Sequence, residues 1–135
     1  MKDARVALFA HNNSERNLLR GAINNPAGGH QVVSEGPSLG AALHVISLMR
    51  SGHREVDVVV VAANVAGGEE TGTDARILVD RLRELEVVPK IIGHASAPFD
   101  TYGIPVDADI LHGELDTDPG RMNYLLASLD PPLRG

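Results

Sequence analysis

The sequence predicts an α/β domain in three layers, with helices on both faces of a five-stranded parallel sheet in the order 2-1-3-4-5. Short apolar runs alternate with segments whose apolar residues recur at helical spacing along the whole chain of 135 residues. One run, residues 57–63, is apolar on both faces, as expected for a central strand covered by helices on each side. The length and the 43% share of hydrophobic residues suit a single core. We therefore expect one domain over residues 1–135.

The first half of the chain is predicted to contain two strands, each followed by a helix. Residues 5–10 form a short apolar run, and Ser14 and Glu15 then open a helical segment. A second strand is expected over 30–34, and the next helix begins around Ser38. The apolar positions that support the two helices are Leu18, Leu19, Ala22 and Ile23 in the first, and Leu39, Ala42, Leu43, Ile46 and Met49 in the second.

The second half repeats this alternation with one irregular connection. After the strand at 57–63, a third helix carries its apolar residues at helical spacing, and a fourth strand is expected over 87–93. The segment 95–106 contains two prolines and a glycine, so a helix in this fourth crossover has room for little more than one turn. A short fifth strand is expected over 108–112. Asp118 and Pro119 then suit the N-cap and first position of the last helix.

The connections between these parallel strands are expected to be right-handed, which gives the strand order stated above. In open sheets of this kind, ligands and chemistry collect at the carboxyl ends of the strands, near the point where the strand order reverses. Functional residues are therefore expected directly after the first, third, fourth and fifth strands.

Composition and charge exclude several classes of protein. The chain has no cysteine, which removes disulfides and thiolate metal sites. A formal net charge of −6 gives no general attraction for nucleic acid or anionic lipid. No apolar run reaches the length of a membrane span, and the first residues do not resemble a signal peptide. We expect a cytoplasmic protein that binds neither nucleic acid nor membrane.

The chain resembles the receiver domains of response regulators, which have the flavodoxin-like architecture. The resemblance extends over nearly the whole length and rests on the order and spacing of several short pieces. These are Arg5-Val6-Ala7-Leu8-Phe9, Asp57 before a run of valines, Gly72 before a helix that ends Val79-Asp80-Arg81-Leu82-Arg83, Pro89-Lys90-Ile91-Ile92, and Ala108-Asp109-Ile110-Leu111.

The resemblance implies five phosphorylation-site positions, and this sequence retains none of them. Receivers place an acidic pair after the first strand, a phosphoacceptor Asp after the third, Thr or Ser after the fourth and Lys after the fifth. The corresponding residues here are Ala10 and His11 for the pair, then Ala62, His94 and Gly113. Phosphoryl transfer to the protein needs a carboxylate nucleophile and oxygen ligands for Mg²⁺. The chain therefore resembles a pseudo-receiver.

Polar residues at the predicted strand ends define a candidate binding crevice, made of His11, Asn12, Asn64 and His94. With His112, three imidazoles fall at this edge, a set that could bind Zn²⁺ or change charge near pH 6.5. No carboxylate partner for them is evident in the sequence pattern. We therefore interpret the histidines as hydrogen-bonded or solvated, and predict neither a metal site nor a cofactor.

Two loops, residues 67–73 and the fourth crossover, contain residues that resemble a binding motif or an exposed epitope. The segment 67–73 has the outer glycine spacing of a phosphate-binding loop, but it lacks the lysine and carries two glutamates, so we interpret it as a connecting loop with Gly72 at the turn into the helix. In the fourth crossover, Phe99, Tyr102 and Ile104 either cover the core or form a recognition epitope.

The functional hypothesis is a non-catalytic signalling or adaptor module that binds a protein partner, or associates with itself as a possible homodimer, without aspartyl phosphorylation. The alternative is a sensor of a small ligand or metal that uses the crevice. An enzyme is not expected, because nucleophiles with acid–base partners are sparse.

Overall fold

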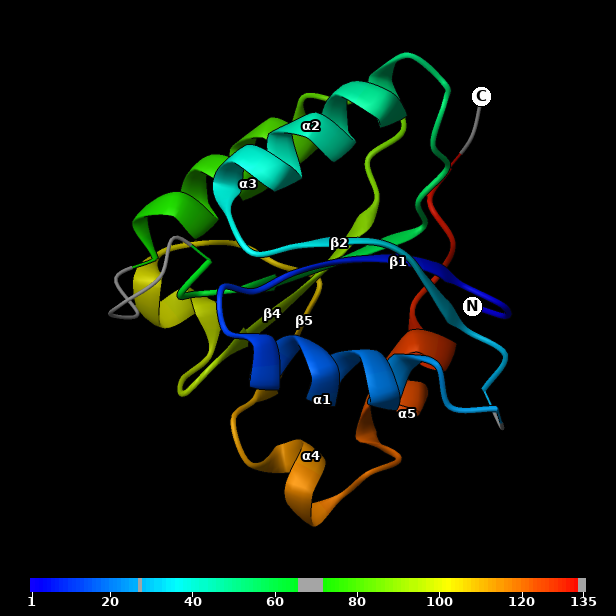
Figure 1. Cartoon of the computed structure of the whole chain (residues 1–135), viewed down its shortest axis with the longest axis vertical. Helices are drawn as coiled ribbons and strands as arrows, with labels where there is room; N and C mark the ends of the chain where they lie inside the picture. Colours follow the sequence, from blue (N-terminus) through cyan, green and yellow to red (C-terminus); the bar gives the residue numbers. More distant parts are fainter. Residues whose placement is uncertain (27, 66–71, 134–135) are drawn as a thin grey trace.

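The computed structural model of the chain describes residues 1–26, 28–65 and 72–133. Strands and helices alternate as the sequence predicts (Figure 1). The strands are β1 Arg5–Phe9, β2 Gln31–Gly36, β3 Val58–Ala62, β4 Lys90–Ala95 and β5 Ala108–Leu111. The helices are α1 Asn13–Ile23, α2 Leu39–Arg50, α3 Thr73–Arg83, α4 Glu114–Thr117 and α5 Arg121–Ser128, with a 3₁₀ turn, η1, at Phe99–Tyr102.

The five strands form one parallel sheet in the order β2-β1-β3-β4-β5, which confirms the predicted topology. The central strand β3 is buried along its whole length. Its residue Val60 lies opposite Leu8 of β1 on one side and Ile92 of β4 on the other. A strand made of β-branched residues suits this position, since both of its faces pack against helices.

Two apolar clusters fill the space on the two faces of the sheet. Helices α2 and α3 cover one face, and α1 and α5 cover the other (Figure 1). The side chains of β3 alternate between the clusters, with Val59 and Val61 in the first and Val58 and Val60 in the second. The sheet is therefore the middle of three layers. No helix in the described parts of the chain is long and apolar enough to cross a membrane.

The fourth crossover is as short as the sequence predicts, because η1 spans a single turn. Phe99 and Ile104 are buried, and the rings of Phe99 and Tyr102 pack edge to face with their centroids 6.1 Å apart. Gly93 of β4 lies directly beneath that ring, where a Cβ atom would come within 2.6 Å of it. Of the two roles considered for this segment, Phe99 and Ile104 therefore cover the core and do not form an exposed epitope.

Several element boundaries differ from the sequence-based prediction by one to three residues. Strand β4 begins at Lys90, not at residue 87, because Pro89 has no N–H for the ladder and the Lys90 N–H makes the bond to Asp57 O, at 3.0 Å. The last helix begins at Arg121, so Asp118 is not its N-cap.

Asp118 instead ends an additional short helix, α4, which the sequence analysis did not predict. Its N–H donates to Glu114 O at 2.7 Å, and its carbonyl accepts from the Arg121 N–H at 3.0 Å. Before α3, Gly72 adopts a left-handed conformation, as predicted for the turn into that helix. Residues 67–71 of the predicted connecting loop lie outside the described residues, and Thr73 is the first residue of α3.

Candidate functional site

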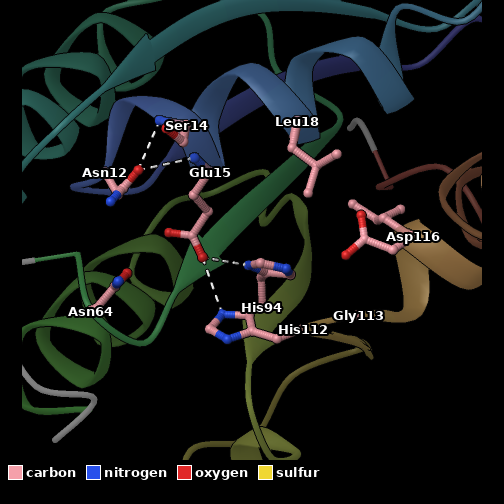
Figure 2. A pocket seen from close by; sticks show the side chains of 10 residues that line it. Asn12, Ser14, Glu15, Leu18, Asn64, His94, His112, Gly113 and Asp116 are labelled. Carbon is pink, nitrogen blue, oxygen red and sulfur yellow. Dashed lines mark hydrogen bonds and ion pairs between the residues drawn. The ribbon is translucent and has the colours of Figure 1, made fainter.

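A pocket of about 380 Å³ opens at the carboxyl edge of the sheet (Figure 2). Its walls come from the start of α1, the ends of β3 and β4, and the turn from β5 into α4. The lining residues are Asn12, Ser14, Glu15, Leu18, Asn64, His94, His112, Gly113, Leu115 and Asp116. The pocket therefore lies at the edge of the sheet where this topology predicts a binding or catalytic site.

The side chain of Glu15 reaches into this pocket from the first turn of α1. Asn12 is the N-cap of the helix, and its Oδ1 accepts from the N–H groups of Ser14, at 2.7 Å, and Glu15, at 3.2 Å. A glutamate three residues after an N-cap often turns back to the N-cap N–H. In this structure the Glu15 carboxylate instead faces the two histidines (Figure 2).

His94 and His112 meet Glu15 from the ends of two neighbouring strands. His94 is on β4, opposite Ala62 of β3, and only 5% of its side chain is exposed. His112 follows β5, and its N–H extends the sheet by donating to Ala95 O at 2.8 Å. Glu15 Oε2 lies 2.8 Å from His94 Nδ1 and 3.1 Å from His112 Nε2, and the imidazole centroids are 4.5 Å apart.

Several polar atoms in this pocket are buried without a hydrogen bond to any of the described residues. They include Glu15 Oε1, His94 Nδ1 and Asn64 Oδ1. His94 Nδ1 is close to Glu15 Oε2, but the direction of the contact does not meet hydrogen-bond geometry. Buried polar atoms of this kind are uncommon in folded proteins and cost free energy unless a ligand, ion or water satisfies them.

Three of the four predicted crevice residues meet in the pocket, namely Asn12, Asn64 and His94. The structure places His11 elsewhere. Its side chain is exposed, and its Nδ1 lies 3.2 Å from Pro37 O, on the side of β2 and α2. His11 is therefore not part of the group formed by Glu15, His94 and His112, although it directly precedes the N-cap of α1.

The residues expected from the sequence at the phosphorylation-site positions carry no carboxylate. Ala10 and Ala62 are fully buried methyl groups. The Arg16 guanidinium donates to the carbonyls of Ala10, at 2.7 Å, and His11, at 2.9 Å, so a permanent positive charge lies at the end of β1. Gly113 has φ +86, a left-handed conformation that favours glycine over lysine.

Sequence reasoning missed Glu15, which supplies the carboxylate that the predicted histidine group lacked. The signal was present, because Glu15 is the third residue after a capping Asn12 and its helix follows the first strand directly. The local pattern alone, however, predicts only that Glu15 opens the helix. Asp116 was also missed, because it belongs to the unpredicted helix α4.

The side chains at this edge of the sheet include three possible metal ligands. Glu15, His94 and His112 each offer one ligand atom, and the three atoms lie within 4.8 Å of one another. Imidazole nitrogens suit Zn²⁺ and similar ions, whereas Mg²⁺ prefers oxygen ligands. Ala10, His11 and Ala62, which the sequence predicts at the receiver positions, offer no side-chain oxygen and do not fit the Mg²⁺ that the resemblance implies.

No protein-family model and no curated protein sequence matches the chain. Solved structures do match it in fold. The phosphorylated cyanobacterial phytochrome response regulator RcpA aligns with a TM-score of 0.70 and 13% identity, over 96% of this chain and 99% of RcpA. The Mn²⁺-bound form of the response regulator Rcp1 aligns with a TM-score of 0.69 and 10% identity, over 96% and 99% of the two chains.

A third match is the structure of CheY6 from R. sphaeroides in complex with the phosphorylated P1 domain of CheA3. It aligns with a TM-score of 0.56 and 17% identity, over 94% of this chain and 100% of the matched chain. Together these likenesses show that the chain has a receiver-like fold, as its sequence pattern predicts.

Proposed function

We propose that the chain is a signalling module of receiver fold that acts by binding a protein partner or a second copy of itself, without accepting a phosphoryl group on an aspartate. One observation carries the proposal. The end of the central strand, where a phosphoacceptor carboxylate is needed, holds the fully buried methyl group of Ala62.

The chemistry of an acyl phosphate supports this proposal. A carboxylate must attack phosphorus while a divalent ion and further positive groups hold the phosphoryl oxygens. The side chain of Ala62 has no nucleophile, and the Arg16 guanidinium is engaged by the carbonyls of Ala10 and His11. On the same ground we propose that the module is not an enzyme.

The carboxylates that do line the pocket are poor replacements for an aspartate on β3. In the described part of the chain these are Glu15 and Asp116. Both come from helices, and Glu15 is in contact with His94 and His112. A phosphoryl group on Glu15 would have to displace these contacts, and only 11% of the Glu15 side chain is exposed.

Binding of a protein partner is consistent with the fold. In the matched structure, CheY6 is bound to the P1 domain of CheA3. For this chain the negative net charge favours a partner with a basic surface, because complementary charge steers association.

The experiment is an amide NMR titration with beryllofluoride and Mg²⁺, which imitate the acyl phosphate of receivers. We expect no shift of the amides of residues 62–65 or 94–96. A saturable shift there, with the matching loss of free beryllofluoride, would overturn the proposal.

The pocket supports a second candidate function, the sensing of a small ligand or metal ion. The buried, unpartnered polar atoms of Glu15, His94 and Asn64 favour it, because a bound group could satisfy them. A ligand present at 100 times its dissociation constant stabilises the fold by about 2.7 kcal/mol. For a domain of this size that is a rise in Tm of roughly 10 °C, which a thermal-shift panel of metabolites and metals would detect.

A further inference from the structure

We propose that Glu15, His94 and His112 form a binding site for one Zn²⁺ ion, with a coordination position left open toward the pocket. The inference rests on the second candidate function, because it names the ligand of that pocket. It does not depend on whether the module accepts a phosphoryl group.

Two of the three distances between the donor atoms are close to those that zinc requires. Zinc ligands lie about 2.0–2.2 Å from the ion, so two ligands of a tetrahedral site are about 3.3 Å apart. The distances from Glu15 Oε2 to His94 Nδ1 and His112 Nε2 are 2.8 Å and 3.1 Å. On these two distances the carboxylate needs to withdraw by only a few tenths of an ångström to admit the ion, and all three donor atoms lie within 4.8 Å of one another.

His94 supplies the observation that a hydrogen-bonded cluster alone does not explain. Its side chain is 95% buried, with 5% exposed, and its Nδ1 points into the group without making a hydrogen bond. Glu15 Oε1 is also buried and unpartnered. A cation bound at His94 Nδ1 would use its lone pair and remove the cost of burying that atom unsatisfied.

The charge at the site also favours a cation. Across the described parts of the chain, Glu15 makes no ion pair with a lysine or an arginine. The side chain of Glu15 is only 11% exposed, so its negative charge is poorly hydrated. Two imidazoles neutralise it only when one of them is protonated, whereas a divalent ion would balance it with both histidines neutral.

The types of donor select zinc or a similar transition metal over the abundant hard cations. Two imidazole nitrogens and one carboxylate oxygen are common zinc ligands. Mg²⁺ and Ca²⁺ need six or more oxygen ligands, and the pocket offers few carboxylate oxygens. Three protein ligands beside a cavity of about 380 Å³ leave the fourth position to water or to a donor group of a bound partner.

The three ligands come from parts of the fold that are held independently. Asn12 fixes the first turn of α1 and so the position of Glu15, and the sheet fixes His94. His112 is held by its bond to Ala95 O. The site is therefore largely formed before an ion binds, which lowers the cost of ordering the ligands.

The experiment is calorimetric titration of the chelator-treated protein with ZnCl₂, followed by Co²⁺ absorption as a readout of the ligand geometry. Three variants are compared with the native chain: Glu15→Gln, His112→Gln and, as a matched control, His11→Gln at the same edge of the sheet. Circular dichroism checks that each variant folds. His112 is the safer histidine to change, because 41% of its side chain is exposed.

We expect one equivalent of Zn²⁺ to bind with a micromolar or lower Kd, and Co²⁺ to give the visible bands of a tetrahedral site. Glu15→Gln and His112→Gln should each weaken binding by at least about tenfold, and His11→Gln should leave it unchanged. No Zn²⁺ binding below millimolar metal would overturn the inference, and so would equal affinity in all four proteins. The beryllofluoride titration tests phosphorylation separately, so each idea can fail without the other.

Discussion

Replacing Gly93 with alanine tests how the short fourth crossover lies on the sheet. Gly93 is on β4, directly before His94, and the ring of Phe99 packs against it. An added Cβ would lie 2.6 Å from two ring atoms and 2.9 Å from a third. The ring has little room to retreat, because Phe99 is fully buried and its N–H donates to Asp109 Oδ1 at 2.9 Å.

The expected loss of stability follows from two opposing effects. Overpacking a core of this kind costs about 1–3 kcal/mol. Replacing glycine with alanine in a strand recovers about 0.5–1 kcal/mol, since the unfolded chain loses freedom. At the middle of these ranges the net cost is about 1.3 kcal/mol. For 135 residues an unfolding entropy of roughly 0.28 kcal/mol/K converts this into a fall in Tm of about 4–5 °C.

Differential scanning calorimetry of the Gly93→Ala variant measures this fall. Gly21→Ala is the matched control, because Gly21 lies inside α1 and a Cβ there would meet nothing within 4 Å. The control should raise stability by about 0.5–1 kcal/mol, as alanine replaces glycine in a helix. If both variants are equally stable, the close packing of Phe99 on Gly93 is wrong.

Three further predictions concern the surroundings of the site and the opposite end of the sheet. Asn12→Ala should cost about 1 kcal/mol in urea unfolding through loss of the helix cap, whereas Asn12→Asp should keep it. Gly113→Ala should lower the free energy of unfolding by about 1 kcal/mol, because alanine is strained in the left-handed backbone conformation. A Cβ atom at this position would meet nothing within 4 Å, so a much larger loss would contradict the structure. Burial and the nearby N-terminal ammonium lower the pKa of His30, against a smaller opposite effect of Asp3, and its Nδ1 accepts from the Ala4 N–H. The unfolded chain therefore binds the proton more readily, so stability should fall as pH drops below about 6.5, and His30→Gln should flatten that slope.

Much of the fold could be predicted because local pattern and topology agree. The valine run of β3 indicates a central strand, and strands that alternate with helices allow few arrangements. Pro98, Gly103 and Pro105 correctly indicated a crossover of one turn. The predicted start of the last helix was wrong. Asp118 and Pro119 resemble an N-cap and first helical position, but they follow the short helix α4, and α5 begins only at Arg121.

The sequence correctly predicted where the site lies, but it identified only some of the residues that form it. Topology placed Asn12, Asn64 and His94 at one edge of the sheet, and all three line the pocket. Local sequence does not show which way a side chain turns after a strand ends. His11 turns toward Pro37, while Glu15, one helical turn further on, turns toward the histidines. The absence of a carboxylate partner, inferred from the strand ends alone, was therefore wrong.

The most direct test of the proposed function is intact-mass spectrometry of the chain after incubation with acetyl phosphate and Mg²⁺, with a phosphorylatable receiver treated in parallel. Because β3 ends in Ala62, we predict that this chain keeps its unmodified mass while the control receiver gains a phosphoryl group. A stoichiometric gain of one phosphoryl group on a carboxylate of this chain would contradict the account.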